Sequence, residues 1–338
     1  MAGVSTGTVD RVLHKRSGVS ESTRKAIDKI IHEHGYEPHM LARNLASNRR
    51  FRFLVCMPRS VYAHDFWSAP VEGIDKALRE TAHFGIEVEY LVFDQHDKNE
   101  FTRKAQSVDP GEYDGLLFAP VFRDESAEML QRWEESGRSC VLFNSRLEGV
   151  RSLSFIGQDA YQSGYLGARI MSYGMEFGRD LLIVNLSQRK DNYEHIIRRE
   201  RGFRSWFEDH TGQVNHLVTL DLNGGRKNRL EREMDALMKK YDFTGIFTTN
   251  SRVHLVADYL ARKGVMKMRL IGYDLVQESI GFLKREYIDF LISQRPVEQA
   301  YKGLKTLFNA VVMEQEVTPV QYMPIDILTR ENIDYYER

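Results

Sequence analysis

Residues 2–16 read AGVSTGTVDRVLHKR, and residues 19–50 read VSESTRKAIDKIIHEHGYEPHMLARNLASNRR. The first stretch predicts a short helix opened by Ser5, because a serine hydroxyl can accept hydrogen bonds from the free amides of a first helical turn. The second predicts a longer helix that ends at Gly35, since apolar side chains recur in it at helical spacing. These side chains are Ala26, Ile27, Ile30 and Ile31. A third short segment over residues 39–47 completes a small all-α domain.

The first fifty residues, called the headpiece below, are more basic than the rest of the chain. They hold nine basic and five acidic side chains, a net charge of +4, whereas the whole chain carries −1. A cationic segment joined to an acidic body is typical of nucleic-acid binding. Charge alone would fit an ordinary solvated surface equally well.

The motifs AGVSTGTVDRVLH, VSESTRKAIDKIIHEHGYEPH and MLARNLASNR resemble the LacI family of bacterial transcription regulators. In that family the first motif is the recognition helix of a helix-turn-helix, and the third is a hinge helix that enters the minor groove beside its dimer mate. The resemblance implies a set of DNA contacts. Thr6, Gly7 and Arg11 would face bases, Ser5 and Thr8 would hold phosphates, and Leu45, flanked by Ala42 and Arg43, would wedge between base pairs.

The headpiece departs from the family pattern at its start. Family members carry one more helix before AGVS, whereas this sequence opens with residues 1–3 inside the turn. That helix supplies part of the core around Val4, Val9 and Val12, and a domain this small has little stability to spare. A start codon assigned too late, or a version that binds DNA poorly, would account for the difference. We expect the headpiece as written to be loosely packed.

From Phe51 onward, called the body below, short apolar strands alternate with amphipathic helices as far as a tail strand over residues 324–329. Repeated alternation of this kind predicts an α/β fold with doubly wound parallel sheets, covered by helices on both faces. The strands are too many for one sheet of usual size, so two lobes are expected. Ligands of such sheets bind at the carboxyl ends of the strands, which two lobes can turn toward each other across a cleft.

The body resembles the type I periplasmic-binding-protein fold over essentially all of residues 51–338. The resemblance implies that lobe 1 comprises about 51–156 and 287–312, and that lobe 2 comprises about 157–286 and 313–338.

Aromatic and polar side chains follow the predicted strands where each strand ends, and the family resemblance assigns several of them to sugar contacts. A single strand-end Asp or Asn is more often a helix cap than a ligand contact, and two aromatic residues can be a helix staple. Together, however, they supply the donors and acceptors that a polyol needs in a dry cleft. The predicted effector contacts are Phe66, Trp67, Asp159, Arg199, Asn250, Asp274 and Gln294, with Phe122, Asn144 and Arg146 as weaker candidates.

The remaining motifs argue against catalysis. The sequence has no nucleophile elbow, phosphate-cradling glycine loop or HExxH motif, so neither an enzyme nor a cofactor is expected. Cys56 and Cys140 lie in apolar runs and are expected to be buried thiols in a reducing cytoplasm. Gly164 and Gly167 are expected to allow tight helix packing.

Two functions from different classes remain. The first is a cytoplasmic DNA-binding regulator, a homodimer or higher oligomer, whose operator affinity is set by a small effector, expected to be a monosaccharide or a derivative. The second is a sugar-type solute-binding or sensor protein without effective DNA binding. The headpiece charge and the MLARNLASNR motif favour the first, and the departure at residues 1–3 favours the second.

Overall fold

The computed structural model describes residues 3–13, 17–33, 49–61, 66–176, 178–186, 194–210, 214–222 and 227–336. The chain divides into two compact units, Met1–Asn48 and Arg49–Arg338, within two residues of the boundary predicted between headpiece and body. Among the residues with described positions, no helical segment has both the length and the apolar character that a bilayer crossing needs.

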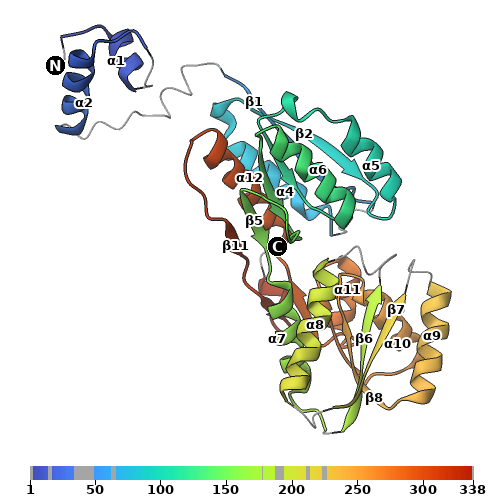
Figure 1. Ribbon diagram of the computed structural model, residues 1–338. Coiled ribbons are helices and arrows are strands. Elements are labelled where there is room, and N and C mark those ends of the chain that lie inside the picture. The colour runs from blue at the N-terminus through green and yellow to red at the C-terminus, as the bar shows by residue number, and fades with distance from the viewer. Residues whose placement is uncertain are drawn as a thin grey trace. The chain divides into compact units, whose positions relative to one another are not determined.

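The first unit contains the two helices expected from its sequence. These are α1, Thr6–Leu13, and α2, Glu21–Glu33 (Figure 1). Ser5 caps α1 as predicted, because its hydroxyl accepts a hydrogen bond from the Thr8 amide at 3.2 Å. Val12 and Ile27 are buried, which agrees with their places on the predicted apolar stripes. The predicted third segment, with Ala42 and Leu45, lies outside the described residues.

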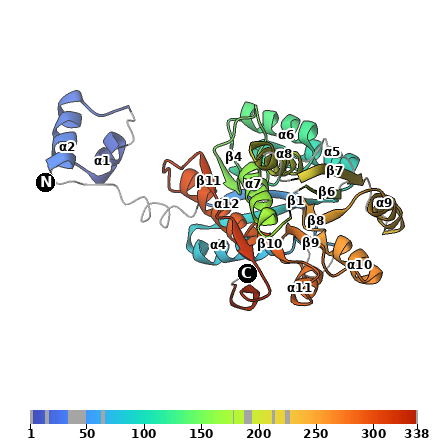
Figure 2. The same cartoon turned by 90° about the horizontal axis from the view of Figure 1, so that it is seen from below.

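The first lobe of the body is built around a six-stranded sheet in which every pair is parallel. In spatial order its strands are β11 (Val320–Tyr322), β5 (Ser154–Gly157), β4 (Ser139–Phe143), β3 (Gly115–Phe118), β1 (Phe51–Pro58) and β2 (Ile86–Phe93). Figure 2 shows helices on both sides of this sheet. They are α4 (Ala69–Glu80) packed with α12 (Pro296–Val311), and α5 (Lys98–Ser107) packed with α6 (Arg123–Glu135).

The second lobe repeats this design. In spatial order its strands are β12 (Asp326–Leu328), β10 (Phe290–Ser293), β9 (Arg269–Tyr273), β8 (Phe243–Thr248), β6 (Arg179–Leu186) and β7 (Val214–Leu222), with β12 alone antiparallel to its neighbour. Its helices are α7 (Ala160–Ser172), α8 (Glu194–Asp209), α9 (Lys227–Lys240), α10 (Val253–Lys263) and α11 (Gln277–Lys284). The predicted two-lobed, doubly wound architecture is therefore confirmed.

Central strands form the core of each lobe. All residues of β3 and β5, and all but the first of β6, are buried, as expected where helices cover both faces of a parallel sheet. Cys56 and Cys140 are buried free thiols in the first sheet, in agreement with the prediction.

The sheets divide the body differently from the predicted lobe boundaries. The predicted segment 287–312 of lobe 1 includes β10, which instead pairs with β9 and β12 in the second sheet. The predicted segment 313–338 of lobe 2 includes β11, which pairs with β5 in the first sheet. An apolar run such as β10 suits either sheet, and a three-residue strand such as β11 leaves little periodic signal.

The body chain passes between the lobes in three places, after β5, after β10 and after β11. One side chain joins all three crossings. Nε2 of Gln158 donates to the carbonyl oxygens of Ser293, at 2.7 Å, and of Pro324, at 2.9 Å. Gln158 is 5% exposed, so these bonds are shielded from water.

Helices α7 and α8 pack at backbone contact. A Cβ atom on Gly164 would lie 2.0 Å from the carbonyl oxygen of Arg199, and one on Gly202 would lie 2.0 Å from that of Tyr161. Only glycine permits this approach at either place. On the same helix, a Cβ on Gly167 would lie 2.9 Å from the Phe247 ring. The expectation that Gly164 and Gly167 allow tight packing is thus confirmed.

Candidate functional site

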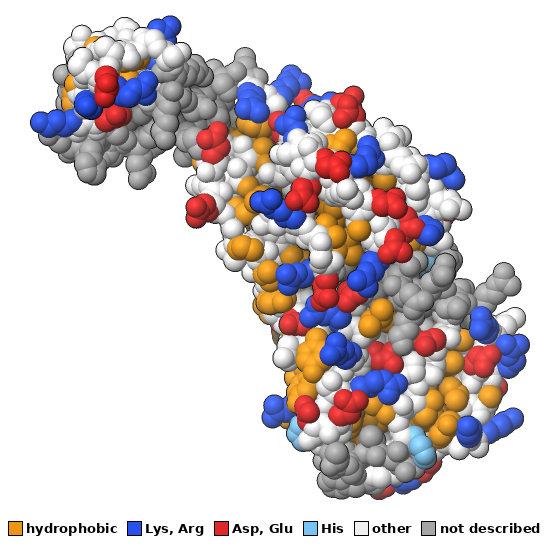
Figure 3. Space-filling model, viewed as in Figure 1, with side chains coloured by type: hydrophobic (Ala, Val, Ile, Leu, Met, Phe, Trp, Pro, Cys, Tyr) orange, Lys and Arg blue, Asp and Glu red, His pale blue; other side chains and the backbone are white. Residues whose placement is uncertain are grey.

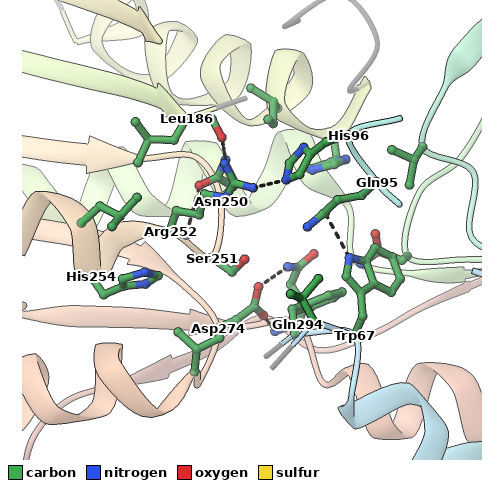
Figure 4. Close-up of a pocket in the computed structure, with 18 of the residues that line it drawn as sticks. Trp67, Gln95, His96, Leu186, Asn250, Ser251, Arg252, His254, Asp274 and Gln294 are labelled. Atoms are coloured by element: carbon green, nitrogen blue, oxygen red, sulfur yellow. Dashed lines mark hydrogen bonds between the residues drawn. The ribbon is translucent and has the colours of Figure 1, made fainter. Parts of the chain in front are cut away.

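A cavity of about 550 Å³ lies between the two lobes of the body, among loops that follow the carboxyl ends of both sheets (Figure 4). Parallel sheets place their ligands at this edge. Six of the seven predicted effector contacts line the cavity, and so does the weaker candidate Asn144. The six are Phe66, Trp67, Arg199, Asn250, Asp274 and Gln294.

Arg199, on α8, is the most deeply buried charge in the cavity wall, with 1% of its surface exposed. Its Nη1 donates to the carbonyl oxygen of Thr249 at 2.8 Å, and its Nη2 donates to Oε1 of Gln294. The guanidinium lies over the Tyr273 ring, 3.7 Å from the ring centroid. Its Nε is buried and has no hydrogen-bond partner within the described parts of the chain.

Asp274 directly follows β9 and has a left-handed backbone, at φ +66°. Its carboxylate accepts two hydrogen bonds from Gln294, one from the backbone amide at 3.2 Å and one from Nε2 at 2.6 Å. Burial raises the pKa of this carboxyl to about 6, and the nearby Arg199 guanidinium opposes the rise. Arg199, Gln294 and Asp274 therefore form one continuous buried chain of donors and acceptors.

The predicted aromatic pair forms another part of the wall. The rings of Phe66 and Trp67 meet edge to face, with centroids 4.9 Å apart and planes at 88°. Nε1 of Trp67 donates to Oε1 of Gln95 at 3.2 Å, which fixes the indole orientation (Figure 4). Apolar ring faces of this kind suit the C–H faces of a sugar ring.

Asn250 lines the cavity, but the backbone occupies both ends of its amide group. Nδ2 donates to the Leu186 carbonyl at 2.8 Å, and Oδ1 accepts from the Arg252 amide at 3.1 Å. Asn250 therefore shapes the loop before α10 in addition to facing the cavity.

Three predicted candidates lie elsewhere. Asp159 caps α7, where its Oδ1 accepts from the amides of Tyr161 and Gln162, and it borders a smaller cavity of about 20 Å³ together with Arg146. Phe122 is packed in the core of the first lobe. Asp159 thus lies outside the lining of the main cavity, and helix capping is the common role of a strand-end carboxylate.

The cavity also contains polar residues that were not predicted. Arg252 follows β8 and donates from Nη2 to Nε2 of His96, which follows β2, at 2.5 Å. This bond joins the two lobes. His195 makes a second connection, since its Nδ1 lies 3.1 Å from the Ser145 hydroxyl, and burial together with Arg199 lowers its pKa to about 3. These residues follow strands or open a helix, so the same strand-end rule would have found His96 and Arg252.

The headpiece presents several of the predicted DNA contacts on its surface. Ser5, Gly7 and Arg11 are exposed, and the hydroxyls of Ser5 and Thr8 lie 2.9 Å apart. Figure 3 shows Lys and Arg side chains on the face of this unit that is in view. The side chain of Thr6 falls outside the described part of the chain. Across the residues that are described, no group of three or more His, Cys, Asp or Glu side chains could hold a metal ion.

Family models match both units. Residues 55–315 match the periplasmic binding protein domain, and residues 1–39 match the bacterial regulatory proteins of the lacI family. The transcriptional regulator MalR of Streptococcus pneumoniae is 29% identical over 167 residues, which cover 48% of each chain, so this chain spans about half the length of that relative. The sucrose operon repressor of Streptococcus mutans is 21% identical over 98% of this chain and 97% of its own length.

Solved structures share the fold of the body. A Bacteroides fragilis protein assigned to the LacI transcriptional regulators is 28% identical, with a TM-score of 0.80 over 86% of this chain and 100% of its own. GanP, a glucose-galactose binding protein from Geobacillus stearothermophilus, is 18% identical, with a TM-score of 0.75 over 85% of this chain and 99% of its own. The second likeness concerns the fold alone.

Proposed function

This chain belongs to the family of periplasmic binding protein domains and carries a lacI-type headpiece, and we propose that it is a DNA-binding transcriptional regulator controlled by a sugar. The observation that carries the sugar assignment is the buried chain Arg199–Gln294–Asp274 in the wall of the interlobe cavity. Relatives named for the sucrose and ribose operons support the same class of effector.

The chemistry of the cavity suits a neutral polyol. Arg199 places a guanidinium charge in the cavity wall, and Asp274 offers carboxylate acceptors. The positive and negative charges of these two groups offset each other, so hydroxyls that both donate and accept match them better than an ion does. Phe66 and Trp67 add apolar ring faces beside the polar chain. Such a mixture binds a sugar with its hydroxyls paired and one face covered.

The headpiece supplies the proposed DNA contacts. Thr6, Gly7 and Arg11 on α1 face bases, Ser5 and Thr8 hold phosphates, and Leu45 beside Ala42 wedges into the minor groove. A twofold operator needs two headpieces, so the acting species is at least a homodimer, in the cytoplasm.

Regulation follows from linkage between the two sites. Sugar binding favours one arrangement of the lobes, and that arrangement changes the affinity of the paired headpieces for the operator. A hundredfold change in operator affinity requires about 2.7 kcal/mol of differential binding. By reciprocity, operator DNA changes sugar affinity by the same factor.

A gel-shift titration across a salt series tests this proposal, with and without a panel of sugars. We expect operator binding that weakens steeply with salt and responds to one sugar. The titration should use this chain and a version that carries one further helix before residues 2–5. Sugar binding without salt-sensitive operator binding in either version would support the alternative, a solute-binding or sensor protein.

A further inference from the structure

A buried polar network continues from Arg199 into the second lobe. Nη1 of Arg199 donates to the main-chain carbonyl of Thr249, which directly follows β8, at 2.8 Å. Two hydrogen bonds hold Thr249 to β6, because its amide donates to the Val184 carbonyl at 3.2 Å and its hydroxyl to Oδ1 of Asn185 at 2.7 Å. The carbonyl that receives Arg199 is therefore fixed by the end of β6.

The side-chain amide of Asn185 has one possible orientation. Its Nδ2 donates to Oε2 of Glu200 at 2.8 Å and to Oδ1 of Asp221 at 2.7 Å, which uses both N–H groups. A flipped amide would place its oxygen against two carboxylates. The oxygen of Asn185 must therefore face Thr249, and the Thr249 hydroxyl is the donor of the bond between them.

Glu200 anchors this amide to α8, the helix that carries Arg199. Oε1 of Glu200 accepts from Nε of Arg204 at 3.0 Å and from the Thr219 hydroxyl at 2.8 Å, so both carboxylate oxygens have partners. A carboxylate that is only 6% exposed needs such pairing. The ring of hydrogen bonds that leaves α8 at Arg199 thus returns to α8 one residue further on.

The loop after β8 is held at a third point. Nδ2 of Asn250 donates to the Leu186 carbonyl at 2.8 Å. Three consecutive residues at the end of β6, 184–186, therefore hold two consecutive residues of the loop, 249 and 250. The first of these two loop residues receives Arg199, and the second lines the cavity.

We infer that Asn185 and Thr249 are positioning residues, which hold the Arg199 guanidinium in the cavity wall. Both are 0% exposed, and neither belongs to the described lining of the cavity. Gln294, which also accepts from Arg199, lies at the crossing after β10, so the Thr249 carbonyl is the acceptor fixed within the second lobe. That Arg199 contacts an effector rests on the proposed function, whereas its placement by Thr249 does not.

A double-substitution cycle in urea unfolding of the full chain tests this placement without a ligand. Thr249→Val keeps the side-chain shape but removes the hydroxyl donor, and Arg199→Lys removes the planar guanidinium. We expect Thr249→Val to raise the unfolding equilibrium constant at least about threefold more in the natural chain than in Arg199→Lys. Thr249→Ser keeps the hydroxyl and should show no such difference. Additive effects of Thr249→Val and Arg199→Lys overturn the inference.

Thr248→Val is the matched control. Thr248 is the last residue of β8, is also 0% exposed, and its hydroxyl has no hydrogen-bond partner among the residues that the structure describes. This substitution removes a hydroxyl from the same place in the chain but no hydrogen bond, so its effect should add to that of Arg199→Lys. A coupling as large as that of Thr249→Val would mean a general disturbance of β8 and would also overturn the inference.

Calorimetry of the same full-chain variants measures the consequence for binding, with ribose, glucose, galactose, sucrose and maltose as probes. We expect Thr249→Val to weaken the sugar that binds by about tenfold, and Thr248→Val to leave its affinity unchanged. Unchanged affinity in Thr249→Val overturns the positioning role. Failure of all five sugars to bind the natural chain counts against the proposed function alone, because the unfolding cycle then decides the placement of Arg199.

Discussion

Gly164 in α7 lies against the carbonyl of Arg199 in α8, so closely that a Cβ atom on the glycine would be 2.0 Å from that oxygen. A methyl group there must push α8 away and move the Arg199 guanidinium with it. We expect Gly164→Ala to lower the free energy of unfolding by at least about 2 kcal/mol and to weaken sugar binding. Urea denaturation and calorimetry measure the two effects.

Gly281→Ala provides the control, because a Cβ on Gly281 meets nothing within 4 Å and the residue lies inside α11. That substitution should leave sugar binding intact and stabilise the chain by up to about 1 kcal/mol. Equal stability of the two variants would contradict the close contact between α7 and α8.

Asp274 should make stability depend on pH. Its folded pKa, raised by burial to about 6, exceeds the value of 3.8 for an exposed Asp. Its contribution is therefore fully present below about pH 4 and is lost as the pH rises through 6. Between pH 5 and pH 7 this loss amounts to about 1 kcal/mol of unfolding free energy. Urea denaturation at the two pH values should show a smaller loss in Asp274→Asn than in the natural chain.

Asp124→Asn, at an exposed position of α6, is the control for that experiment and should keep the pH dependence of the natural chain. The same loss of stability in Asp274→Asn would show that another group titrates in this range.

Removing the Asp274 carboxylate should uncouple the two proposed sites. Asp274→Ala takes away both acceptor oxygens, so we expect sugar affinity to fall at least about a hundredfold. The headpiece is a separate compact unit, so operator affinity without sugar should be retained. A gel shift with increasing sugar would then show no response, whereas an unchanged dose–response would remove Asp274 from the effector site.

Trp67 should report ligand binding by fluorescence. The other two tryptophans, Trp133 and Trp206, are buried in the cores of the lobes, whereas Trp67 lines the cavity. In Trp67→Phe we expect the sugar-induced fluorescence change to disappear. Affinity should fall about fivefold, because phenylalanine keeps a ring face but loses the hydrogen bond to Gln95. A full signal in this variant would mean that a core tryptophan moves on binding.

Much of the fold could be predicted from local sequence. Buried parallel strands such as β3 are continuous apolar runs, and the alternation of such runs with helices predicted the two doubly wound sheets. The small strand β11 was missed because three residues form a strand only when a neighbouring sheet edge accepts them. The lobe to which a strand belongs depends on where the chain passes from one lobe to the other, and these passages leave no periodic pattern in the sequence.

The site could be predicted in part for a similar reason. Strand ends locate residues such as Asp274 and Gln294, since one sheet carries both to the same edge. The bond between His96 and Arg252 joins residues 156 positions apart on different lobes, so no local pattern indicates it. Asp159 shows the limit of the strand-end rule, because its carboxylate already accepts hydrogen bonds from the first amides of α7.

Gln158 has a consequence for how the body can move. Gln158 lies in the crossing segment after β5. Its side-chain amide binds the other two crossing segments, at the carbonyl oxygens of Ser293 and Pro324. Because the three crossing segments are hydrogen-bonded to one another at one point, the lobes can rotate about that point. Sliding of one lobe past the other would break both bonds. We therefore expect an effector to change the angle between the two lobes by a rotation whose axis passes close to Gln158.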